Sequence, residues 1–294
     1  MNDPARTITI ARMLPRLQAQ GLDRLDAQLL LLHALNQATH ARAWLLAHDT
    51  DTLDAATLQR LDDLVQRRKR GEPLAYITGH KEFFGLNLAV DARVLVPRPD
   101  TETLVEWTLE VLFSASSNSS VLDLGTGSGA IALALKATRP DLRLIAIDDS
   151  EDALTVARAN AQRLQLEVQF QQGSWLECAA GRYHAIVSNP PYIAAQDRHL
   201  DALTYEPLQA LASGADGLDD IRQIITQAPA HLQPGGWLLL EHGYDQASAV
   251  RALLLAAGLK DVQSRRDLSG IERCSGARAL LNKSEIRRDF HELA

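Results

Sequence analysis

"VLDLGTGSGAIALAL", residues 121–135, decides the fold of this chain. An apolar strand runs into a turn with glycines at positions 125, 127 and 129, and an apolar helix follows. In an open α/β sheet, ligands bind at the carboxyl ends of the strands, where glycines let the backbone approach a ligand closely. The spacing is GxGxG and not GxGxxG, and no P-loop lysine follows. This weakens the case for a dinucleotide and removes the case for a P-loop ATPase.

An acidic residue at the next strand end strengthens the case for a ligand. Asp148 closes the predicted strand 142–148, about twenty residues beyond Gly129, where a carboxylate can accept hydrogen bonds from a ribose diol. A helix cap would explain Asp149 or Ser150 but explains Asp148 less well. Strand, glycine turn, helix, strand and acid together predict a site for a nucleoside-type cofactor.

Strand and helix signals alternate through the rest of the chain, which is typical of a mostly parallel sheet covered on both faces. Two late runs, 260–268 and 276–283, suggest a final hairpin-like pair. The segment 75–96 alternates and carries Gly79 and Gly85, which suggests a hairpin or short linker strands. After it, Asp100 or Thr101 is a plausible helix cap. The predicted main strands are 121–125, 142–148, 167–173, 183–189 and 237–243.

The first seventy or so residues have leucines at helical spacing, over 24–35 and again over 52–70. The second run ends in basic residues followed by Gly71, as a helix C-terminus does. No glycine- or cysteine-rich chemistry occurs there, so we expect a small helical bundle that packs against or binds something. The tail has helical spacing at Ile286, Phe290 and Leu293, but disorder explains it equally well.

The composition is 46% hydrophobic and 23% charged, which is typical of a soluble globular protein. No apolar run reaches the roughly 18 residues of a membrane span, and the N-terminus lacks the pattern of a signal peptide, so we expect a cytoplasmic protein. Cys178 and Cys274 belong to no CxxC pair, and the histidines show no ligand spacing, so we expect no metal. The net charge of −7 argues mildly against broad, salt-driven DNA binding.

A second motif, "VSNPPYIAAQ" (187–196), closes the predicted strand 183–189. One interpretation is a strand terminator, because proline cannot extend a ladder and asparagine suits turns. The other is that the rigid turn holds hydrogen-bond acceptors for a planar NH2 group, with Asn189 as one of them. Proline's fixed φ would make that acceptor geometry rigid.

These two motifs resemble those of the class I S-adenosylmethionine-dependent methyltransferases. The resemblance implies a Rossmann-like, seven-stranded, mostly parallel sheet, with S-adenosylmethionine as cofactor and S-adenosylhomocysteine as product. It also implies that Asn189 and the main-chain carbonyl of Pro190 accept the two N–H bonds of an amino or amide group, beside Tyr192. The implied substrate loop is Asn189, Pro190, Pro191 and Tyr192, and the implied cofactor residues are Gly125, Thr126, Gly127, Ser128, Gly129, Asp148, Trp175 and Asn189.

The chemistry is consistent with that assignment. The lone pair of an amide or arylamine nitrogen is delocalised, so this nitrogen is a poor nucleophile. Two acceptors on its hydrogens orient it and favour pyramidal character as positive charge develops, which is electrostatic stabilisation combined with in-line positioning. No general base is evident in the motif, and none has to act before methyl transfer.

Stretches along nearly the whole chain resemble a narrower family, the bacterial protein-(glutamine-N5) methyltransferases that modify the Gly-Gly-Gln glutamine of peptide chain release factors. These include "GEPLAYITGHKEFFGL", "VLVPRPDTETLVEW", "YEPLQALASGADGLDDIRQI" and "RDLSGIERCSGARAL". The resemblance implies a monomer whose partner is a release factor and not a nucleic acid or membrane. The implied parts are a helical recognition domain (1–72), a β-hairpin linker (73–98), a catalytic domain (99–283) and a tail (284–294).

Some assignments stay open at this point. Related chains often have an aspartate where Ser174 stands, so any carboxylate contact to the adenine amino group would be weaker or missing here. Trp175 flanks the adenine or belongs to the core, and Arg98 and Glu102 line the cofactor cleft or only begin a helix. The alternative function is an adenine-N6 methyltransferase acting on DNA or RNA, for which the sequence offers an acidic balance and no large insertion.

Overall fold

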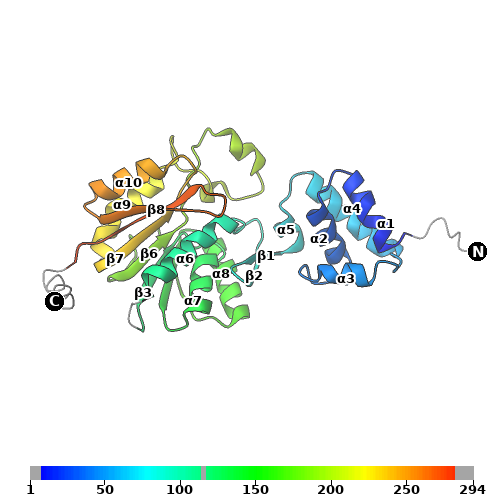
Figure 1. The fold of residues 1–294 in the computed structure, drawn as a ribbon, viewed down its shortest axis with the longest axis horizontal. Helices are drawn as coiled ribbons and strands as arrows, with labels where there is room; N and C mark the ends of the chain where they lie inside the picture. The colour runs from blue at the N-terminus through cyan, green and yellow to red at the C-terminus, as the bar shows by residue number, and fades with distance from the viewer. Residues whose placement is uncertain (1–7, 114–116, 282–294) are drawn as a thin grey trace, which may run out of the picture. The chain divides into compact units, whose positions relative to one another are not determined.

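The computed structural model describes residues 8–113 and 117–281. The chain forms two compact units, Met1–His80 and Lys81–Ala294, which are described separately (Figure 1). The predicted tail and residues 114–116 lie outside the described residues. Within the described ranges, no helix combines the length and the apolar character needed to cross a membrane.

The N-terminal unit is helical, as the leucine spacing predicts. Helix α2 is its centre, because Leu30, Leu31 and Leu32 have no exposed surface although successive helical residues point in different directions. Helix α2 contacts the other helices of the unit. These elements are α1 (Ile10–Ala19), α2 (Arg24–Ala34), α3 (Arg42–Ala47), α4 (Ala55–Lys69) and α5 (Leu74–Thr78).

Side-chain caps and a glycine set the ends of these helices. Asp23 and Asp54 cap the starts of α2 and α4 by accepting hydrogen bonds from the backbone N–H three residues later. Helix α4 ends as predicted: Gly71 has a φ of 97°, and its N–H donates to the carbonyl of Arg68.

Strands β1 (His80–Phe83) and β2 (Leu86–Ala89) form the predicted hairpin, but the start of the predicted segment is wrong. Residues 74–78 are helical. Leu74 and Ile77 lie three residues apart, on one face of α5, and both pack on the core of the N-terminal unit. Gly79, at a φ of 76°, ends this helix. Tertiary packing therefore overrides the alternation that the sequence shows.

The second unit contains a seven-stranded sheet in the order β5-β4-β3-β6-β7-β9-β8, in which β9 is antiparallel to both of its neighbours. The other pairs are parallel, so the predicted α/β fold class is confirmed. The strands are β3 (Ser120–Leu124), β4 (Arg143–Asp148), β5 (Gln169–Gln172), β6 (Tyr183–Ser188), β7 (Leu232–Glu241), β8 (Lys260–Arg266) and β9 (Glu272–Arg278).

The last strand begins four residues before the predicted run 276–283. Asp267 fixes the preceding turn, because its carboxylate accepts hydrogen bonds from the backbone N–H groups of Ser269 and Ile271. Gly270 takes a φ of 83° in the same turn. The chain can therefore pair again from Glu272, which the apolar pattern of the sequence does not reveal.

Helices cover both faces of the sheet (Figure 1). Val121 of β3 faces a core formed with α6 and α7, whereas Leu122 and Leu124 face a core formed with α9 and α10. This burial on both faces explains why the strands are almost continuously apolar. The helices are α6 (Glu102–Val111), α7 (Ala130–Thr138), α8 (Glu151–Leu164), α9 (Asp219–His231) and α10 (Ala247–Ala256).

Two helix starts test the predicted caps. Ser150 caps α8 by accepting a hydrogen bond from the Ala153 N–H. The predicted cap position of α6 is confirmed at Thr101, which a short 3-10 turn (η2, Pro99–Thr101) leads into. Thr101 stands at the N-cap position, but its side chain makes no capping bond there. The Thr101 hydroxyl is thus available for other contacts.

The strand order places the two sequence motifs side by side. From β3 the chain moves outward through β4 and β5, and then returns to β6 on the other side of β3. Leu124 is paired with Ser188, whose hydroxyl donates to the Leu124 carbonyl at 2.7 Å. The glycine turn and the Asn-Pro-Pro-Tyr turn therefore leave neighbouring strands at the same edge, where the strand order reverses and ligands usually bind.

A buried amide joins the hairpin to this edge. Asn160 of α8 has no exposed surface, and its Oδ1 accepts a hydrogen bond from the Ala89 N–H at 2.7 Å. Its Nδ2 donates to the carbonyls of Ala89 and Ser128, both at 3.0 Å. One side chain thus holds β2 and the glycine turn against α8.

Replacing this amide tests how much the hairpin depends on it. Asn160→Ala leaves three buried or half-buried backbone groups without their partner, so we expect the free energy of unfolding to fall by about 2–4 kcal/mol. Urea denaturation measures this, with Gln162→Ala as the control, because Gln162 is exposed on the same helix. Equal stabilities of the two variants would contradict the role of Asn160.

Candidate active site

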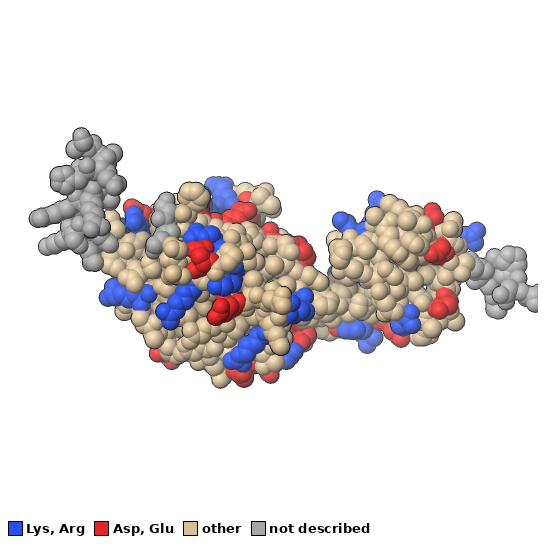
Figure 2. Space-filling view, turned by 90° about the horizontal axis from the view of Figure 1, so that it is seen from below, with Lys and Arg blue, Asp and Glu red and all other residues tan. Residues whose placement is uncertain are grey.

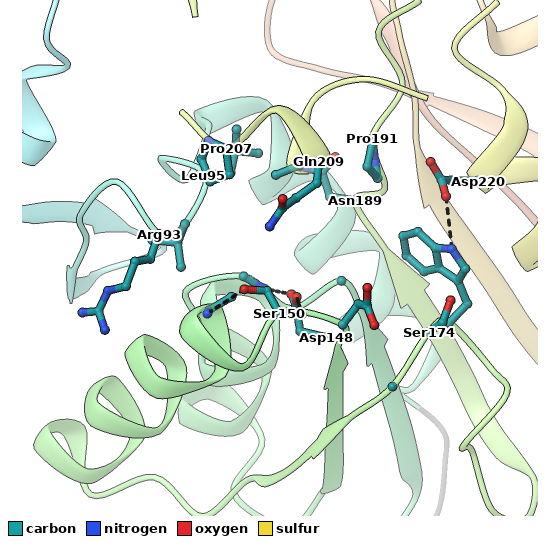
Figure 3. Close-up of a pocket in the computed structure, with 18 of the residues that line it drawn as sticks. Arg93, Leu95, Asp148, Ser150, Ser174, Asn189, Pro191, Pro207, Gln209 and Asp220 are labelled. Atoms are coloured by element: carbon teal, nitrogen blue, oxygen red, sulfur yellow. Dashed lines mark hydrogen bonds between the residues drawn. The ribbon is translucent and has the colours of Figure 1, made fainter. Parts of the chain in front are cut away.

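A cavity of about 540 Å³ opens at the carboxyl ends of four neighbouring strands (Figure 3). Each strand end contributes to its wall. The lining residues from these ends are Gly125 and Gly127 after β3, Asp148, Asp149 and Ser150 after β4, Gly173, Ser174 and Trp175 after β5, and Asn189 and Pro191 after β6. A cavity of this volume is in the range of small-molecule sites.

The glycine turn forms the floor of the cavity on the β3 side. Gly125, Gly127 and Gly129 all have positive φ values, which residues with a side chain rarely adopt. A Cβ atom on Gly125 would also lie 3.3 Å from the Trp175 ring. The other two residues of the predicted turn point elsewhere: Thr126 and Ser128 are buried, and neither they nor Gly129 line the cavity.

The Asp148 carboxylate lies at the cavity wall and also shapes the turns beside it. Oδ2 accepts a hydrogen bond from the Gly127 N–H at 2.8 Å, and Oδ1 accepts one from the Ser150 N–H at 2.9 Å. Burial raises the pKa of this carboxyl, while the two backbone bonds partly oppose that shift. Each oxygen retains a further lone pair, so the group can still accept bonds from a diol.

Trp175 belongs to the core in part and also has a surface at the cavity. Its ring packs against a core cluster and also lines the cavity. Its Nε1 donates to Asp220 Oδ1 of α9 at 3.1 Å, which fixes the plane of the ring, and Figure 3 shows Asp220 at this bond. Ser174 lines the cavity beside Trp175, so the cavity wall carries a neutral serine where related chains often have an aspartate.

A smaller cavity of about 270 Å³ adjoins the first. Asn189 lines both of them and thus stands at their junction. Tyr192 lines the smaller cavity, whereas Pro191 lines the larger one and Pro190 is buried. The remaining wall of the smaller cavity consists of Leu95, Arg98, Ile193, Leu203, Ala210 and Leu211.

The amide of Asn189 has a defined orientation. Its Nδ2 donates to the Thr101 hydroxyl at 3.2 Å, so the carbonyl oxygen Oδ1 is the group left to accept a bond from a ligand. The Tyr192 hydroxyl donates to Glu241 Oε1 at 3.2 Å. Burial, the main cause, raises the pKa of Tyr192, so its phenol stays protonated at neutral pH.

The sequence did not indicate several of the residues that build these walls. Pro207, Gln209 and Ala210 come from the segment after β6, which a partly buried ion pair holds in place. Glu206 pairs with Arg98 at 2.5 Å and also accepts a hydrogen bond from the Val96 N–H. Both partners occur in stretches that the resemblance includes, but a pairing 108 residues apart leaves no local signal.

Arg98 and Glu102 therefore have different roles. Arg98 lines the smaller cavity and not the larger one. Glu102 lines neither, and its carboxylate accepts a hydrogen bond from the Phe84 N–H at 3.0 Å. Glu102 thus joins the hairpin loop to the start of α6. This agrees with the alternative in which Glu102 belongs to the start of a helix and does not line the cleft.

A glycine turn and an Asn-Pro-Pro-Tyr turn that meet at the switch point of this sheet define a class I methyltransferase. Residues 101–247 match the Methyltransferase small domain family. The fold is similar to that of the hMettl16 catalytic domain solved with a MAT2A 3'UTR hairpin, with a TM-score of 0.55 at 16% identity over 78% of this chain and 82% of that one. A methyltransferase from Pyrococcus furiosus aligns with a TM-score of 0.52 at 18% identity over 75% of this chain and all of that one.

The sequence relatives are more specific. Residues 10–79 match the PrmC N-terminal domain family. A release factor glutamine methyltransferase from Bordetella pertussis is 50% identical over 87% of this chain and 95% of its own length. One from Coxiella burnetii is 47% identical over 87% of this chain and 91% of its own length. At this identity and coverage, the chain belongs to the release factor glutamine methyltransferase family.

Behind the glycine turn lies an acid that the sequence analysis did not single out. Asp123 has no exposed surface, and its Oδ2 accepts hydrogen bonds from the Thr126 hydroxyl at 2.6 Å and the Ala132 N–H at 3.2 Å. Its Oδ1 has no hydrogen-bond partner among the residues that the structure describes. Burial is the main cause that raises the pKa of Asp123 to about 7, and the charge of Asp148 adds to it.

This shift predicts a pH-dependent stability. The native state binds the Asp123 proton more tightly than the unfolded state, so the contribution of this group is complete below about pH 4 and is lost as the pH rises through about 7. Asp123→Asn lacks this dependence, so the unfolding free energy of the wild-type protein should decline by about 2–3 kcal/mol more than that of the variant between pH 5 and 8.

Thermal or urea unfolding across that pH range measures the difference. Asp201→Asn is the control, because Asp201 is exposed, and it should keep the wild-type slope. Parallel slopes for the wild-type protein and Asp123→Asn would contradict the raised pKa.

Proposed function

We propose that this chain transfers a methyl group from S-adenosylmethionine to the side-chain amide nitrogen of the Gly-Gly-Gln glutamine in a peptide chain release factor. The observation that carries this proposal is the position of Asn189 at the junction of the two cavities, with its N–H group bonded to Thr101. The names of the relatives supply the substrate class.

The larger cavity offers a hydrogen-bond acceptor and surfaces that would suit the cofactor. The Asp148 carboxylate would hold the ribose hydroxyls, and the Trp175 ring would lie against the base. Gly125 and Gly127 would let the main chain approach the ligand without a side chain between them. When bound, the cofactor supplies an electrophilic methyl group on its sulfonium.

The residues of the smaller cavity would prepare the substrate nitrogen. Asn189 Oδ1 and the main-chain carbonyl of Pro190 would accept its two N–H bonds, which orients a nitrogen whose lone pair is otherwise delocalised. Tyr192 would form the wall on one side. Because its phenol is protonated at neutral pH, Tyr192 would not act as a base, and the excess proton would leave after methyl transfer.

The charge distribution also favours a protein substrate. On the face that Figure 2 presents, basic and acidic side chains are interspersed, and the chain carries a net charge of −7. A nucleic-acid surface usually has a continuous basic patch. We propose that residues 1–72 contact the release factor, that residues 99–283 catalyse the reaction, and that the protein acts as a monomer in the cytoplasm.

A labelled-methyl assay that offers release factor and DNA side by side tests this function. We expect label on the release factor glutamine alone, and we expect Asn189→Ala to lower the rate by at least 100-fold, since it removes an acceptor at the reacting atom. Asn87→Ala, on the exposed face of the hairpin, is the matched control. Label on DNA alone would overturn the substrate, and near-normal turnover of Asn189→Ala would overturn the acceptor role.

Calorimetry tests the cofactor site. Asp148→Ala removes a carboxylate that would bond the ribose and also orders the Gly127 turn, so we expect binding of S-adenosylmethionine to weaken about 10- to 100-fold. Asp152→Ala, at an exposed position of α8, should bind as the wild-type protein does. An unchanged affinity of Asp148→Ala would remove Asp148 from the cofactor site.

A further inference from the structure

A buried carboxylate lies behind the Asn-Pro-Pro-Tyr turn. Glu241 is the last residue of β7 and has 1% of its surface exposed. The Tyr192 hydroxyl donates to its Oε1 at 3.2 Å, and the Thr101 hydroxyl is its other hydrogen-bond donor. Glu241 therefore contacts Tyr192, which borders the smaller cavity, and Thr101, which holds Asn189. Glu241 itself lines neither cavity.

The hydrogen bonds among Asn189, Thr101, Tyr192 and Glu241 all run from donor to acceptor toward the Glu241 carboxylate. The Asn189 Nδ2 donates to Thr101, so the Thr101 hydroxyl uses its oxygen as an acceptor there and directs its own proton to Glu241. Tyr192 directs its proton to the same carboxylate. An ionised carboxylate can only accept, so Glu241 in its ionised form fixes the polarity of every bond that leads to it.

This polarity matters because an asparagine amide can rotate to exchange its oxygen and nitrogen. A hydroxyl by itself accepts or donates, so Thr101 alone would hold either orientation of Asn189. Once the Thr101 hydroxyl donates its hydrogen bond to Glu241, Thr101 is only an acceptor toward Asn189. The amide must then present its N–H to Thr101, and its oxygen is turned to the ligand side.

The surroundings of Glu241 make a purely structural role a poor explanation. Burial is the main cause that raises its pKa to about 7; the nearby Asp100 adds to this shift, and Arg273 opposes it. Arg273 itself contacts Asp100 and Asp267. Glu241 Oε2 has no hydrogen-bond partner within the described residues. A buried acid with an unpartnered oxygen costs stability, and a glutamine or an apolar residue would avoid much of that cost.

We propose that Glu241 is a positioning residue for methyl transfer, which holds the Asn189 amide through Thr101 and the Tyr192 ring through its hydroxyl. This inference rests on the proposed function, because it concerns the same acceptor oxygen. Glu241 does not touch the substrate, and its effect is on the orientation of groups that do. The effect should therefore fall on turnover and not on cofactor affinity.

Four single variants and one double variant test the inference. Thr101→Val removes only the hydroxyl, Thr101→Ser restores it, and Glu241→Gln replaces the obligate acceptor by a group that can also donate. Thr108→Val is the matched control, because Thr108 is a buried threonine of α6, the helix that follows Thr101, and its hydroxyl donates to the Leu104 carbonyl within α6. The kcat with release factor and the Kd for S-adenosylmethionine are measured for each variant and for the wild-type protein.

We expect Thr101→Val and Glu241→Gln each to lower kcat about 10- to 100-fold, with Kd within about 2-fold of the wild-type value. Thr101→Ser should stay within about 3-fold in kcat, and Thr108→Val should equal the wild-type protein. The double variant Thr101→Val, Glu241→Gln should lose no more than the more damaged single variant, because both changes interrupt one path.

Wild-type kcat in Thr101→Val or in Glu241→Gln would overturn the inference, and so would multiplicative losses in the double variant. A loss of kcat that Thr101→Ser does not rescue, or an equal loss of cofactor affinity, would assign these residues a structural role and would also overturn it. A wild-type protein that labels no release factor is a different result, because it rejects the proposed function before any variant is compared.

Discussion

The parallel pairing of β3 with β6 is the constraint on which the site depends. These strands are far apart in sequence, yet Leu124 and Ser188 are in register, and a side-chain hydrogen bond joins their ends. A shift of one residue would turn the apolar side chains of β6 to the opposite face, so the two buried cores hold the register. The glycine turn and the Asn-Pro-Pro-Tyr turn are adjacent for this reason.

Three buried or half-buried acids then shape that edge from within the protein. Asp123 accepts a hydrogen bond from the inner side of the glycine turn, and Asp148 accepts one from its outer side. Glu241 accepts hydrogen bonds from two hydroxyls behind Asn189. Burial raises the pKa of all three, so each lowers the stability of the ionised protein. Each of these acids accepts hydrogen bonds and thereby orients a group at the site, which an apolar core residue cannot do.

The sequence predicts those parts of the fold and site that depend on local pattern. The apolar runs identify β3, β4 and β6, and the positions of the glycines and Asp148 place them at one edge. The features that the sequence does not predict have non-local causes. Helix α5 forms because its apolar face packs on other helices. The contacts of Thr101 and Glu241 arise only when η2, β6 and β7 come together.

The same geometry limits what the Asn-Pro-Pro-Tyr turn can select. An amide and an arylamine both present a planar NH2 group, so two acceptors for its hydrogens do not distinguish glutamine from adenine. In the proposed function, the choice would then lie in the walls of the smaller cavity, which include the aliphatic side chains of Leu95, Ile193 and Leu211. The Arg98–Glu206 ion pair fixes the segments that carry these walls. Substrate choice and acceptor geometry thus belong to different groups of residues, and either could change without the other.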